Sequence, residues 1–412
     1  MASPLPVSPL APARFPDLPA IKGVELAVAA SGTSYKGRDD LMLMRFAEAS
    51  QMAGVFTRSA TAAAPVDWTR AQLAKGHGRA VLVNAGNANA FTGQQGIATV
   101  QHTTARLADQ LGMAAADILT ASTGVIGEPL DAAGLAACFG QLKNTLGQAS
   151  WQAAANAIRT TDTFAKGASA SCQIAGQPVT ISGIAKGSGM IAPDMATMLG
   201  FIATDAVLDQ PVLQACLTAA TRQSFNAITV DSDTSTSDMV LLGATRQAGH
   251  PPITSPDDPA LAGFQAALLE VMQDLACQIV RDGEGASKFI TIDITGATSE
   301  ASAYKIGLAI GNSPLVKTAI AGEDANWGRI VMAVGKAGEP ADRDRLKISI
   351  GGIVIAAEGQ RVADYDEAPI AAHMKGTSIH IAVDLGLGAG AARIWSCDLT
   401  HGYISINADY RS

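Results

Sequence analysis

Short apolar stretches typical of β-strands recur along the whole chain, and the helical patterns between them follow no regular order. The strand-like stretches include GVELAVAASG (23–32), RAVLVNAGNAN (79–89) and FITIDITG (289–296). A doubly wound parallel sheet would need strands and helices in strict alternation, which this pattern does not follow. The sequence therefore predicts an α+β fold in which sheets and helices pack in layers.

Apolar spacing and turn residues place the remaining elements. Helical spacing is found at 96–112, 132–147, 151–159, 210–223, 258–282 and 312–321. Residues 169–185 are expected to form a hairpin across Ala-Gly-Gln-Pro, and the Pro-rich first 20 residues an extended arm. The Pro- and Asp-rich segment 246–260 is expected to be an exposed loop. Further strand-like alternation is seen at 226–245, where two strands are expected, and at 329–338 and 392–410.

The charge balance argues against a nucleic acid or an anionic membrane as the main partner. The chain has 29 Lys and Arg against 37 Asp and Glu, a net charge of −8, whereas both partners require clustered basic residues. No apolar run reaches the roughly 18 to 20 residues that span a bilayer, and the first 20 residues lack the apolar core of a signal peptide. We therefore expect a cytoplasmic protein that acts on a small molecule.

No metal site or disulfide framework is expected. The cysteines are scattered without paired spacing and are interpreted as small buried residues: Cys138, Cys172, Cys216, Cys277 and Cys397. In TVDSDTSTSD (229–238), Asp231, Asp233 and Asp238 are spaced loosely like a calcium loop. The segment lacks the Gly and the distal Glu of an EF-hand. A polar loop that braces neighbouring turns is therefore favoured.

Two common catalytic patterns are also disfavoured. The glycine-rich segment 185–190 lacks the spacing of a phosphate-binding loop, because its Lys precedes the glycines. None of the histidines lies beside a Ser or Cys in a nucleophile-elbow context. Neither a P-loop enzyme nor a Ser-His-Asp hydrolase is expected.

The loop AKGSGMIAPDMATMLGFIATDA (185–206) contains a candidate nucleophile, Thr197. A threonine hydroxyl within a chain is a weak nucleophile and needs an adjacent base. Cleavage of the chain before Thr197 would supply that base, because the freed α-amine has a reference pKa of about 8. Nucleophile and base would then belong to one residue.

The surrounding residues suit such a cleavage. Gly187 and Gly189 permit unusual backbone angles, and Pro193 stiffens the approach. Strain of roughly 1 to 3 kcal/mol could be stored there and released when the Thr197 hydroxyl attacks the Ala196 carbonyl in an N-to-O acyl shift. On these residues alone, the favoured interpretation is that Thr197 is merely the first residue of a buried strand.

The same loop resembles the signature of the ornithine acetyltransferase family of arginine biosynthesis, also called the bifunctional glutamate N-acetyltransferase or ArgJ family. The resemblance spans nearly the whole chain. It is also carried by NAGNANAFTG (84–93), ASTGVIGEPL (121–130), TTDT (160–163), DGEGASKF (282–289), NSPLVKTAIAGEDANWGRI (312–330) and CDLTHGYISINADYRS (397–412). It favours the nucleophile interpretation of Thr197.

The resemblance implies self-cleavage between Ala196 and Thr197 into an α chain (1–196) and a β chain (197–412). The α chain would carry the oxyanion site and part of the substrate site. The β chain would begin with the nucleophile Thr197 and fold its C-terminus back to the site. The acetyl group would pass from N2-acetyl-L-ornithine to Thr197 and then to the amine of L-glutamate, which is ping-pong acyl transfer.

The resemblance also implies roles for individual residues. Thr123 and Gly124 would form the oxyanion site, where one donor is typically worth roughly 3 to 4 kcal/mol. Lys186 would pair with the substrate α-carboxylate, and Glu284 would meet the ornithine ammonium or move protons at the reacting nitrogen. The implied substrate contacts are Thr160, favoured over Thr161, with Lys186, Thr197, Glu284, Asn407 and Ser412. Taken alone, the Thr123–Gly124 segment fits an ordinary turn equally well. Without the resemblance, a solvated loop charge would be favoured for Lys186 and a helix-end residue for Glu284.

At the level of the molecule, the resemblance implies layered sheets and helices of the ArgJ/DmpA type. It implies no cofactor, and a heterotetramer of two α and two β chains. Whether acetyl-CoA is a second acetyl donor stays open. Two other functions are also open: an N-terminal-nucleophile aminopeptidase or amidase that releases its acyl group to water, and a ligand-binding protein with an unreactive Thr197.

Overall fold

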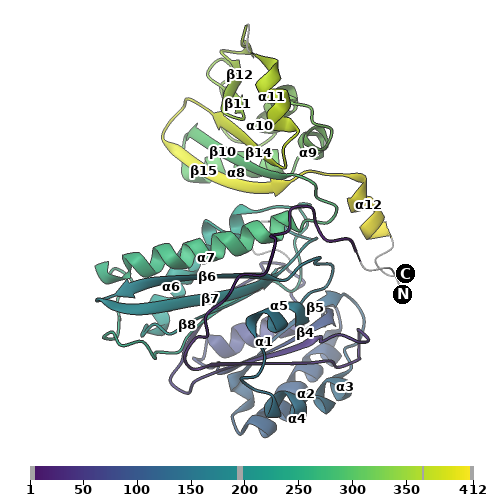
Figure 1. Ribbon diagram of the computed structural model, residues 1–412, viewed down its shortest axis with the longest axis vertical. Helices are drawn as coiled ribbons and strands as arrows, with labels where there is room; N and C mark the ends of the chain where they lie inside the picture. The colour runs from purple at the N-terminus through teal and green to yellow at the C-terminus, as the bar shows by residue number, and fades with distance from the viewer. Residues whose placement is uncertain (1–4, 193–197, 364–365, 409–412) are drawn as a thin grey trace.

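Three β-sheets organise the part of the chain that the computed structural model describes, residues 5–192, 198–363 and 366–408 (Figure 1). Two sheets pack face to face in the N-terminal part of the chain, and the third belongs to the C-terminal part. This arrangement is the layered α+β fold that the sequence predicts. None of the described helices is both long and apolar enough to cross a membrane.

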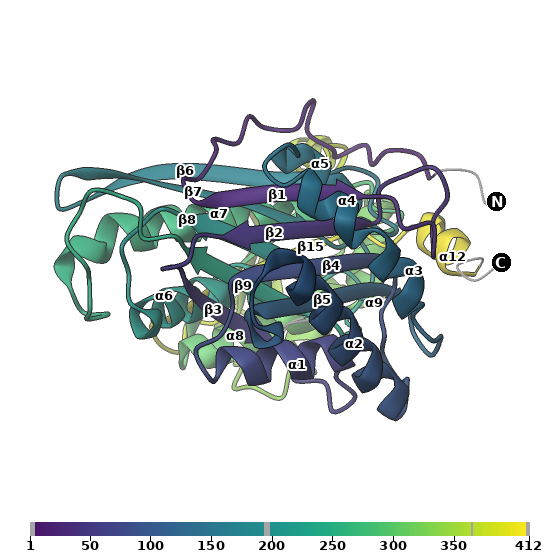
Figure 2. The same ribbon diagram turned by 90° about the horizontal axis from the view of Figure 1, so that it is seen from below.

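The first sheet has a helical layer on one side and the second sheet on the other. Because alternate residues of a strand point to opposite faces, Met42 and Met44 pack toward the second sheet, whereas Leu41 and Leu43 pack under the helices. The strand order is β1 (Val24–Ala29), β2 (Leu41–Phe46), β4 (Ala80–Asn87) and β5 (Ile118–Val125). The covering helices are α2 (Gly93–Leu111), α3 (Ala132–Ala137) and α4 (Phe139–Asn144), seen from below in Figure 2.

The second sheet shares a core with the first through Phe201 and Leu241. Its opposite face, with Ile202 and Leu242, packs against two helices, α6 (Gln210–Arg222) and α7 (Ala262–Arg281). Another helix, α5 (Trp151–Ala157), contacts strands of both sheets. The strand order is β3 (Gln51–Phe56), β9 (Met239–Ala244), β8 (Leu199–Thr204), β7 (Gln177–Lys186) and β6 (Lys166–Ile174). The predicted hairpin is therefore present as β6 and β7.

The third sheet lies at the top of Figure 1, on the side of α7 that faces away from the second sheet. Its strand order is β13 (Gln360–Arg361), β12 (Ile353–Ala357), β11 (Lys347–Ile350), β14 (Ser378–Asp384), β10 (Phe289–Ala297) and β15 (Gly390–Cys397). Its helices are α8 (Glu300–Gly311), α9 (Pro314–Ala321), α10 (Trp327–Gly335) and α11 (Glu367–Met374). After β15, helix α12 (His401–Ala408) leaves this sheet and returns toward the N-terminal arm (Figure 1).

The N-terminal arm is extended, as predicted, and crosses from the region of α12 to the second sheet (Figure 1). The Ser8 hydroxyl donates to the carbonyl of Arg281 at the end of α7. Further along, the carbonyl of Pro19 accepts hydrogen bonds from Trp151 Nε1 at 3.2 Å and Ser182 Oγ at 3.1 Å. The arm thus ties α5, α7 and β7 together.

Several predicted elements are wrong. Residues 329–338 are mostly helix α10 rather than a strand, because Asn326 caps that helix and its face of Ile330, Ala333 and Val334 is buried. The end of 392–410 is helix α12. Segment 226–245 contains one strand, β9, since its first part is a 3-10 turn and a single bridge from Ile228 to Trp395. Helices α1 (Ala64–Leu73), α8 and α11 were not predicted, and 132–147 divides into α3 and α4.

Candidate active site

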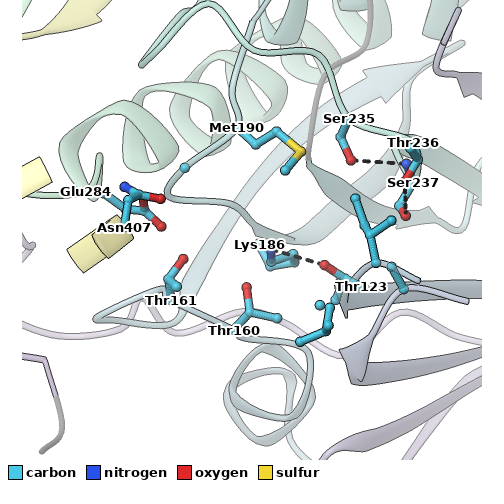
Figure 3. Close-up of a pocket in the computed structure, with 15 residues that line it drawn as sticks. Thr123, Thr160, Thr161, Lys186, Met190, Ser235, Thr236, Ser237, Glu284 and Asn407 are labelled. Carbon is cyan, nitrogen blue, oxygen red and sulfur yellow. Dashed lines mark hydrogen bonds between the residues drawn. The ribbon is translucent and has the colours of Figure 1, made fainter. Parts of the chain in front are cut away.

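A cavity of about 310 Å³ lies where the ends of several elements meet (Figure 3). It gathers most of the predicted site residues, namely Thr123, Gly124, Thr160, Lys186, Glu284 and Asn407. Both Thr160 and Thr161 line it. The other lining residues are Ala88, Val125, Ile126, Gly189, Met190, Ser235, Thr236 and Ser237. The predicted Ala196, Thr197 and Ser412 lie outside the described residues.

Thr123 and Gly124 reach the cavity at the end of β5. This strand pairs in parallel with β4, so that Gly124 lies opposite Gly86. Gly124 has φ +130°, and a Cβ at this position would lie 2.2 Å from the carbonyl carbon of Gly86. Only glycine fits both the backbone angle and the space. The strand end therefore presents the Thr123 hydroxyl and an unhindered Gly124 backbone to the cavity.

Lys186, the last residue of β7, lies beside Thr123. Its ammonium is 3.3 Å from Thr123 Oγ1 and 3.9 Å from Asp162 Oδ2, and only 3% of its side chain is exposed. Burial lowers the pKa of Lys186, while the charge of Asp162 acts in the opposite direction. The ammonium is therefore held in a largely enclosed position at the proposed oxyanion site.

Behind Lys186 lies a fully buried ion network that sequence analysis did not identify. Lys166 Nζ is 2.7 Å from Asp162 Oδ1 and 2.6 Å from Asp282 Oδ2. Asp162 Oδ1 also accepts the Gly187 N–H at 2.6 Å, and Asp282 accepts the Thr163 N–H at 2.9 Å. Asp162 was visible only as part of the TTDT motif. Lys166 follows Asp162 by only four residues, but Gly187 and Asp282 come from distant segments, and the burial of the network cannot be read from local spacing.

The opposite end of the cavity is formed by Glu284 and Asn407 (Figure 3). Asn407 Nδ2 donates to Glu284 Oε2 at 2.7 Å. Burial raises the pKa of Glu284, and hydrogen bonds from Asn407 and Thr161 partly oppose that rise. Gly189 backs directly onto this carboxyl, since a Cβ there would lie 2.4 Å from Glu284 Cδ.

Helix α12 carries Asn407 to the cavity because its start is docked against the chain after α7. The Thr400 hydroxyl donates to the carbonyl of Gly285 at 2.7 Å. Gly285 has φ +74°, and a Cβ there would lie 2.4 Å from the backbone nitrogen of Tyr403. The close contact fixes the helix beside Glu284. The C-terminal segment thus folds back onto the cavity.

A third wall is formed by the hydroxyl-bearing segment Ser235, Thr236 and Ser237, which sequence analysis did not assign to the site. Next to it, Asp238 is fully buried, and its Oδ1 accepts the Met198 N–H at 2.8 Å. Its Oδ2 has no partner among the described residues. Burial raises the pKa of Asp238 well above its ordinary value.

The strand register brings the chain that follows Thr197 to the same place. Leu199 pairs with Lys186 on one side and with Met239 on the other. Met198, which is covalently joined to Thr197, therefore lies between the Lys186 wall and the Asp238 wall. This is where the described chain comes closest in sequence to the predicted nucleophile.

The Asp-rich loop has the bracing role that the sequence predicts. Asp231 accepts the N–H groups of Met190 at 2.6 Å and Ile191 at 2.8 Å, and Asp238 accepts that of Met198. Within the described ranges, no group of three His, Cys, Asp or Glu could hold a metal ion. The arrangement is suited to acyl transfer: the Thr123 hydroxyl and the backbone of Gly124 line one part of the cavity, and Glu284, a carboxyl group of raised pKa, lies opposite them.

Comparisons with known proteins find similar sequences over nearly the whole chain. A family profile described as "ArgJ family" matches residues 25–412. An "Arginine biosynthesis bifunctional protein ArgJ" from Gluconobacter oxydans is 57% identical over 100% of this chain and 97% of its own length. A crystal structure of the same-named protein from Bacillus halodurans is 43% identical, with a TM-score of 0.50, and covers 52% of this chain with 100% of its own. An ornithine acetyltransferase from Mycobacterium tuberculosis, solved with ornithine, is 34% identical over 42% of this chain and 93% of its own, with a TM-score of 0.37.

Proposed function

The chain belongs to the ArgJ family, and we propose that its cavity transfers the acetyl group of N2-acetyl-L-ornithine to L-glutamate in arginine biosynthesis. The chain is an acyltransferase in which substrate enters between the Lys186 wall and Glu284. The observation that carries the proposal is that one cavity gathers Thr123, Gly124, Lys186, Glu284 and Asn407 from distant segments, beside the chain that follows Thr197.

The first step of the proposal is self-cleavage. Thr197 Oγ attacks the carbonyl carbon of Ala196, the peptide C–N bond breaks, and water then hydrolyses the resulting ester. The products are an α chain (1–196) and a β chain (197–412) with a free Thr197 α-amine. Residues 197–412 make up 216 of 412 residues, or 52%, and the Bacillus halodurans chain covers the same share of this one with its whole length. That coverage supports the two-chain form.

Acetyl transfer follows in two half-reactions. The Thr197 α-amine takes the proton of Oγ, Oγ attacks the acetyl carbonyl, and the C–N bond of acetylornithine breaks as the proton passes to the leaving ornithine nitrogen. Glutamate then attacks the acetyl-Thr ester and receives the acetyl group. In both tetrahedral intermediates the oxyanion is stabilised by the Thr123 hydroxyl and the Gly124 backbone.

Substrate recognition uses the two ends of the cavity. Lys186 supplies positive charge for the α-carboxylate, and Thr160, Asn407 and Ser412 add polar contacts. Glu284 meets the side-chain ammonium of ornithine or transfers protons at the reacting nitrogen. A carboxyl group of raised pKa suits the second role, because proton transfer is most effective when the pKa of the catalytic group lies near the operating pH.

The assembly and the co-substrate are parts of the same proposal. We expect a heterotetramer of two α and two β chains in the cytoplasm, with no cofactor. Acetyl-CoA is proposed as a second acetyl donor, since the relatives are named bifunctional. Thr197 would accept its acetyl group by the same attack, with the CoA thiolate as the leaving group.

Acetyl-labelled acetylornithine tests the activity directly. In the presence of glutamate, the label is expected in acetylglutamate, and Thr197→Ala is expected to transfer none. Label released mainly as free acetate, whether or not glutamate is present, would contradict the proposal and indicate an N-terminal-nucleophile amidase. Stoichiometric binding without any transfer would indicate a ligand-binding protein.

A further inference from the structure

We propose that Asp162 is a positioning residue for the oxyanion site, because it holds the Lys186 ammonium against Thr123 and so directs the Thr123 hydroxyl proton into the cavity. This inference rests on the proposed acyl transfer. It assigns Lys186 a role in the transition state, in addition to any contact with a substrate carboxylate. It also gives a function to a buried carboxylate that the mechanism above does not use.

The direction of the Thr123 hydroxyl follows from the chemistry of its neighbour. A lysine ammonium has three donors and no acceptor, so in the 3.3 Å contact Thr123 Oγ1 must accept from Lys186. Within the described ranges, no group accepts a hydrogen bond from Thr123, and its side chain faces the cavity (Figure 3). The hydroxyl proton is therefore free to be donated to an oxygen atom in the cavity, which is what an oxyanion site requires.

This direction depends on the charge of Lys186. A neutral amine has a lone pair and could accept the Thr123 hydroxyl proton, which would turn the donor away from the cavity. Burial already favours the neutral form by lowering the pKa of Lys186. A nearby negative charge is needed to keep the ammonium protonated in so enclosed a position.

Asp162 is the carboxylate best placed to supply that charge. Its Oδ2 lies 3.9 Å from Lys186 Nζ and its side chain is fully buried. Of the other groups that act on Lys186, Lys166 lowers its pKa, whereas Glu284 and Asp238 raise it less than Asp162 does. Burial raises the pKa of Asp162, whereas the charges of Lys166 and Lys186 lower it, and the net result is a lowered pKa. Asp162 therefore stays ionised.

Asp162 is also fixed in place from several directions. Its Oδ2 accepts the Thr160 N–H at 3.1 Å, and its Oδ1 accepts the Gly187 N–H at 2.6 Å and the Lys166 ammonium at 2.7 Å. These contacts join the segment that carries Thr160, a proposed substrate contact, to the residue that follows Lys186. One carboxylate thus links that segment to the proposed oxyanion site.

The test compares Asp162→Asn with Asp282→Asn. Both variants remove one carboxylate from the same Lys166 network, but only Asp162 is within ion-pair distance of Lys186 in the described part of the chain. In Asp162→Asn, kcat per cleaved chain is expected to fall about 10- to 100-fold, against the 10²- to 10³-fold typical of losing an oxyanion donor outright. The high-pH limb of the kcat profile should move to lower pH, because Lys186 loses its proton more easily.

In Asp282→Asn, the high-pH limb of the kcat profile is expected to stay where it is in the wild type, even if the thermal stability of this variant is lower. Equal pH profiles for the two variants, or an unchanged limb in Asp162→Asn, would overturn the inference. The wild-type enzyme serves as the reference for the proposed function: if it formed no acetyl-enzyme, the acyl-transfer proposal itself would fail.

A second measurement applies even if Asp162→Asn does not fold. Because Lys186 is inferred to act through Thr123, Lys186→Met should lower kcat strongly in the wild type but add little in a Thr123→Val background. Independent, multiplying losses in the double variant would contradict the inference. A change confined to KM in Lys186→Met would assign Lys186 to substrate binding alone.

Discussion

At the scale of single residues, two buried carboxyl groups next to the cavity show how environment determines charge. Asp162 and Asp238 are both enclosed, yet the pKa of Asp162 is lowered and that of Asp238 is raised. Asp162 faces the ammonium groups of Lys166 and Lys186. Asp238 has the Met198 N–H for one oxygen and no partner within the described residues for the other. The neighbouring ammonium groups therefore stabilise the anionic form of Asp162, whereas burial disfavours the charged form of Asp238.

Asp238→Asn is predicted to change stability in a pH-dependent way. Because the pKa of this carboxyl is raised in the folded state, its contribution to the free energy of unfolding is fully present below the unfolded pKa of about 3.9. That contribution is lost as pH rises toward the folded pKa. Asn keeps the acceptor for Met198 and cannot ionise. The melting temperature of the variant, relative to that of the wild type, should therefore increase as pH rises from about 4 to 7. A difference that is constant with pH, or that shrinks, would contradict the assigned cause.

Gly124→Ala is predicted to destabilise the protein and to abolish transfer. The variant combines an unfavourable φ, worth roughly 1 to 3 kcal/mol, with a Cβ only 2.2 Å from the Gly86 carbonyl carbon. Gly140→Ala is the matched control, because a Cβ there meets nothing within 4 Å and the residue lies in helix α4. Ala is favoured over Gly in a helix by up to about 1 kcal/mol, so this variant should be at least as stable as the wild type. Urea denaturation compares the two, and equal effects would show that the close approach to Gly86 is unimportant.

The limits of sequence reasoning at this scale are physical. A Thr within a Gly- and Pro-containing loop is a local signal, so Thr197 could be singled out as a candidate, whereas Gly124 could not be distinguished from an ordinary turn glycine. The Asp162 network and the Ser235–Ser237 wall depend on segments far apart in the chain, and burial cannot be read from spacing alone. The residue roles carried over from the family could be proposed only through the resemblance.

At the scale of elements, α12 shows how a terminal helix completes a site. Its docking against Gly285 leaves Asn407 within hydrogen-bond distance of Glu284. A short, mostly exposed helix has little packing of its own to hold it. The contacts of Thr400 and Tyr403 near its start therefore determine where Asn407 lies.

Asn407→Ala is predicted to raise the KM for acetylornithine roughly 10- to 100-fold. The variant loses the hydrogen bond to Glu284, and a hydrogen bond to a charged group contributes about 1.5 to 3 kcal/mol. It should also raise the pKa of Glu284, because the Asn407 hydrogen bond lowers it. The acid limb of the rate profile would then move to higher pH. Ser405→Ala on the same helix removes only a bond to the His401 carbonyl and should leave both quantities unchanged. A Ser405→Ala effect of equal size would indicate general fraying of the helix.

Elements with clear periodicity were predictable, and those without it were not. Helices α2, α5, α6 and α9 and the β6–β7 hairpin agree with their patterns. The apolar run of α10 carries no polar alternation to distinguish a helix from a strand, and α12 alternates like a strand although it is helical. In both cases tertiary packing and capping, rather than local preference, determine the structure.

At the scale of the whole molecule, the two packed sheets support the cavity at their edge. The interface between them is predicted to dominate stability. Phe201→Ala should cost about 3 to 5 kcal/mol, because its ring is 1% exposed between the sheets. Phe91→Ala is the matched control, since that ring is 84% exposed. A urea midpoint that moves equally in both variants would contradict the layered core.

The layered class was predictable from the irregular order of strands and helices, because few other arrangements bury such strands on both faces. The meeting of β5, β7, the 235–237 segment and α12 at one cavity was not, since long-range register leaves no mark on local spacing. Family resemblance implied that residues of β5, β7 and the C-terminal segment share one site, but only the structure adds the 235–237 segment to it.

The most direct measurement of the central claim is the intact mass of the denatured protein before and after brief exposure to N-acetylornithine. The wild type should give two chains divided after residue 196, and the β chain alone should gain one acetyl group that glutamate removes. Thr197→Ala should remain a single chain and gain none. An uncut wild type that turns over normally, or an acetyl group on any residue other than Thr197, would contradict the account.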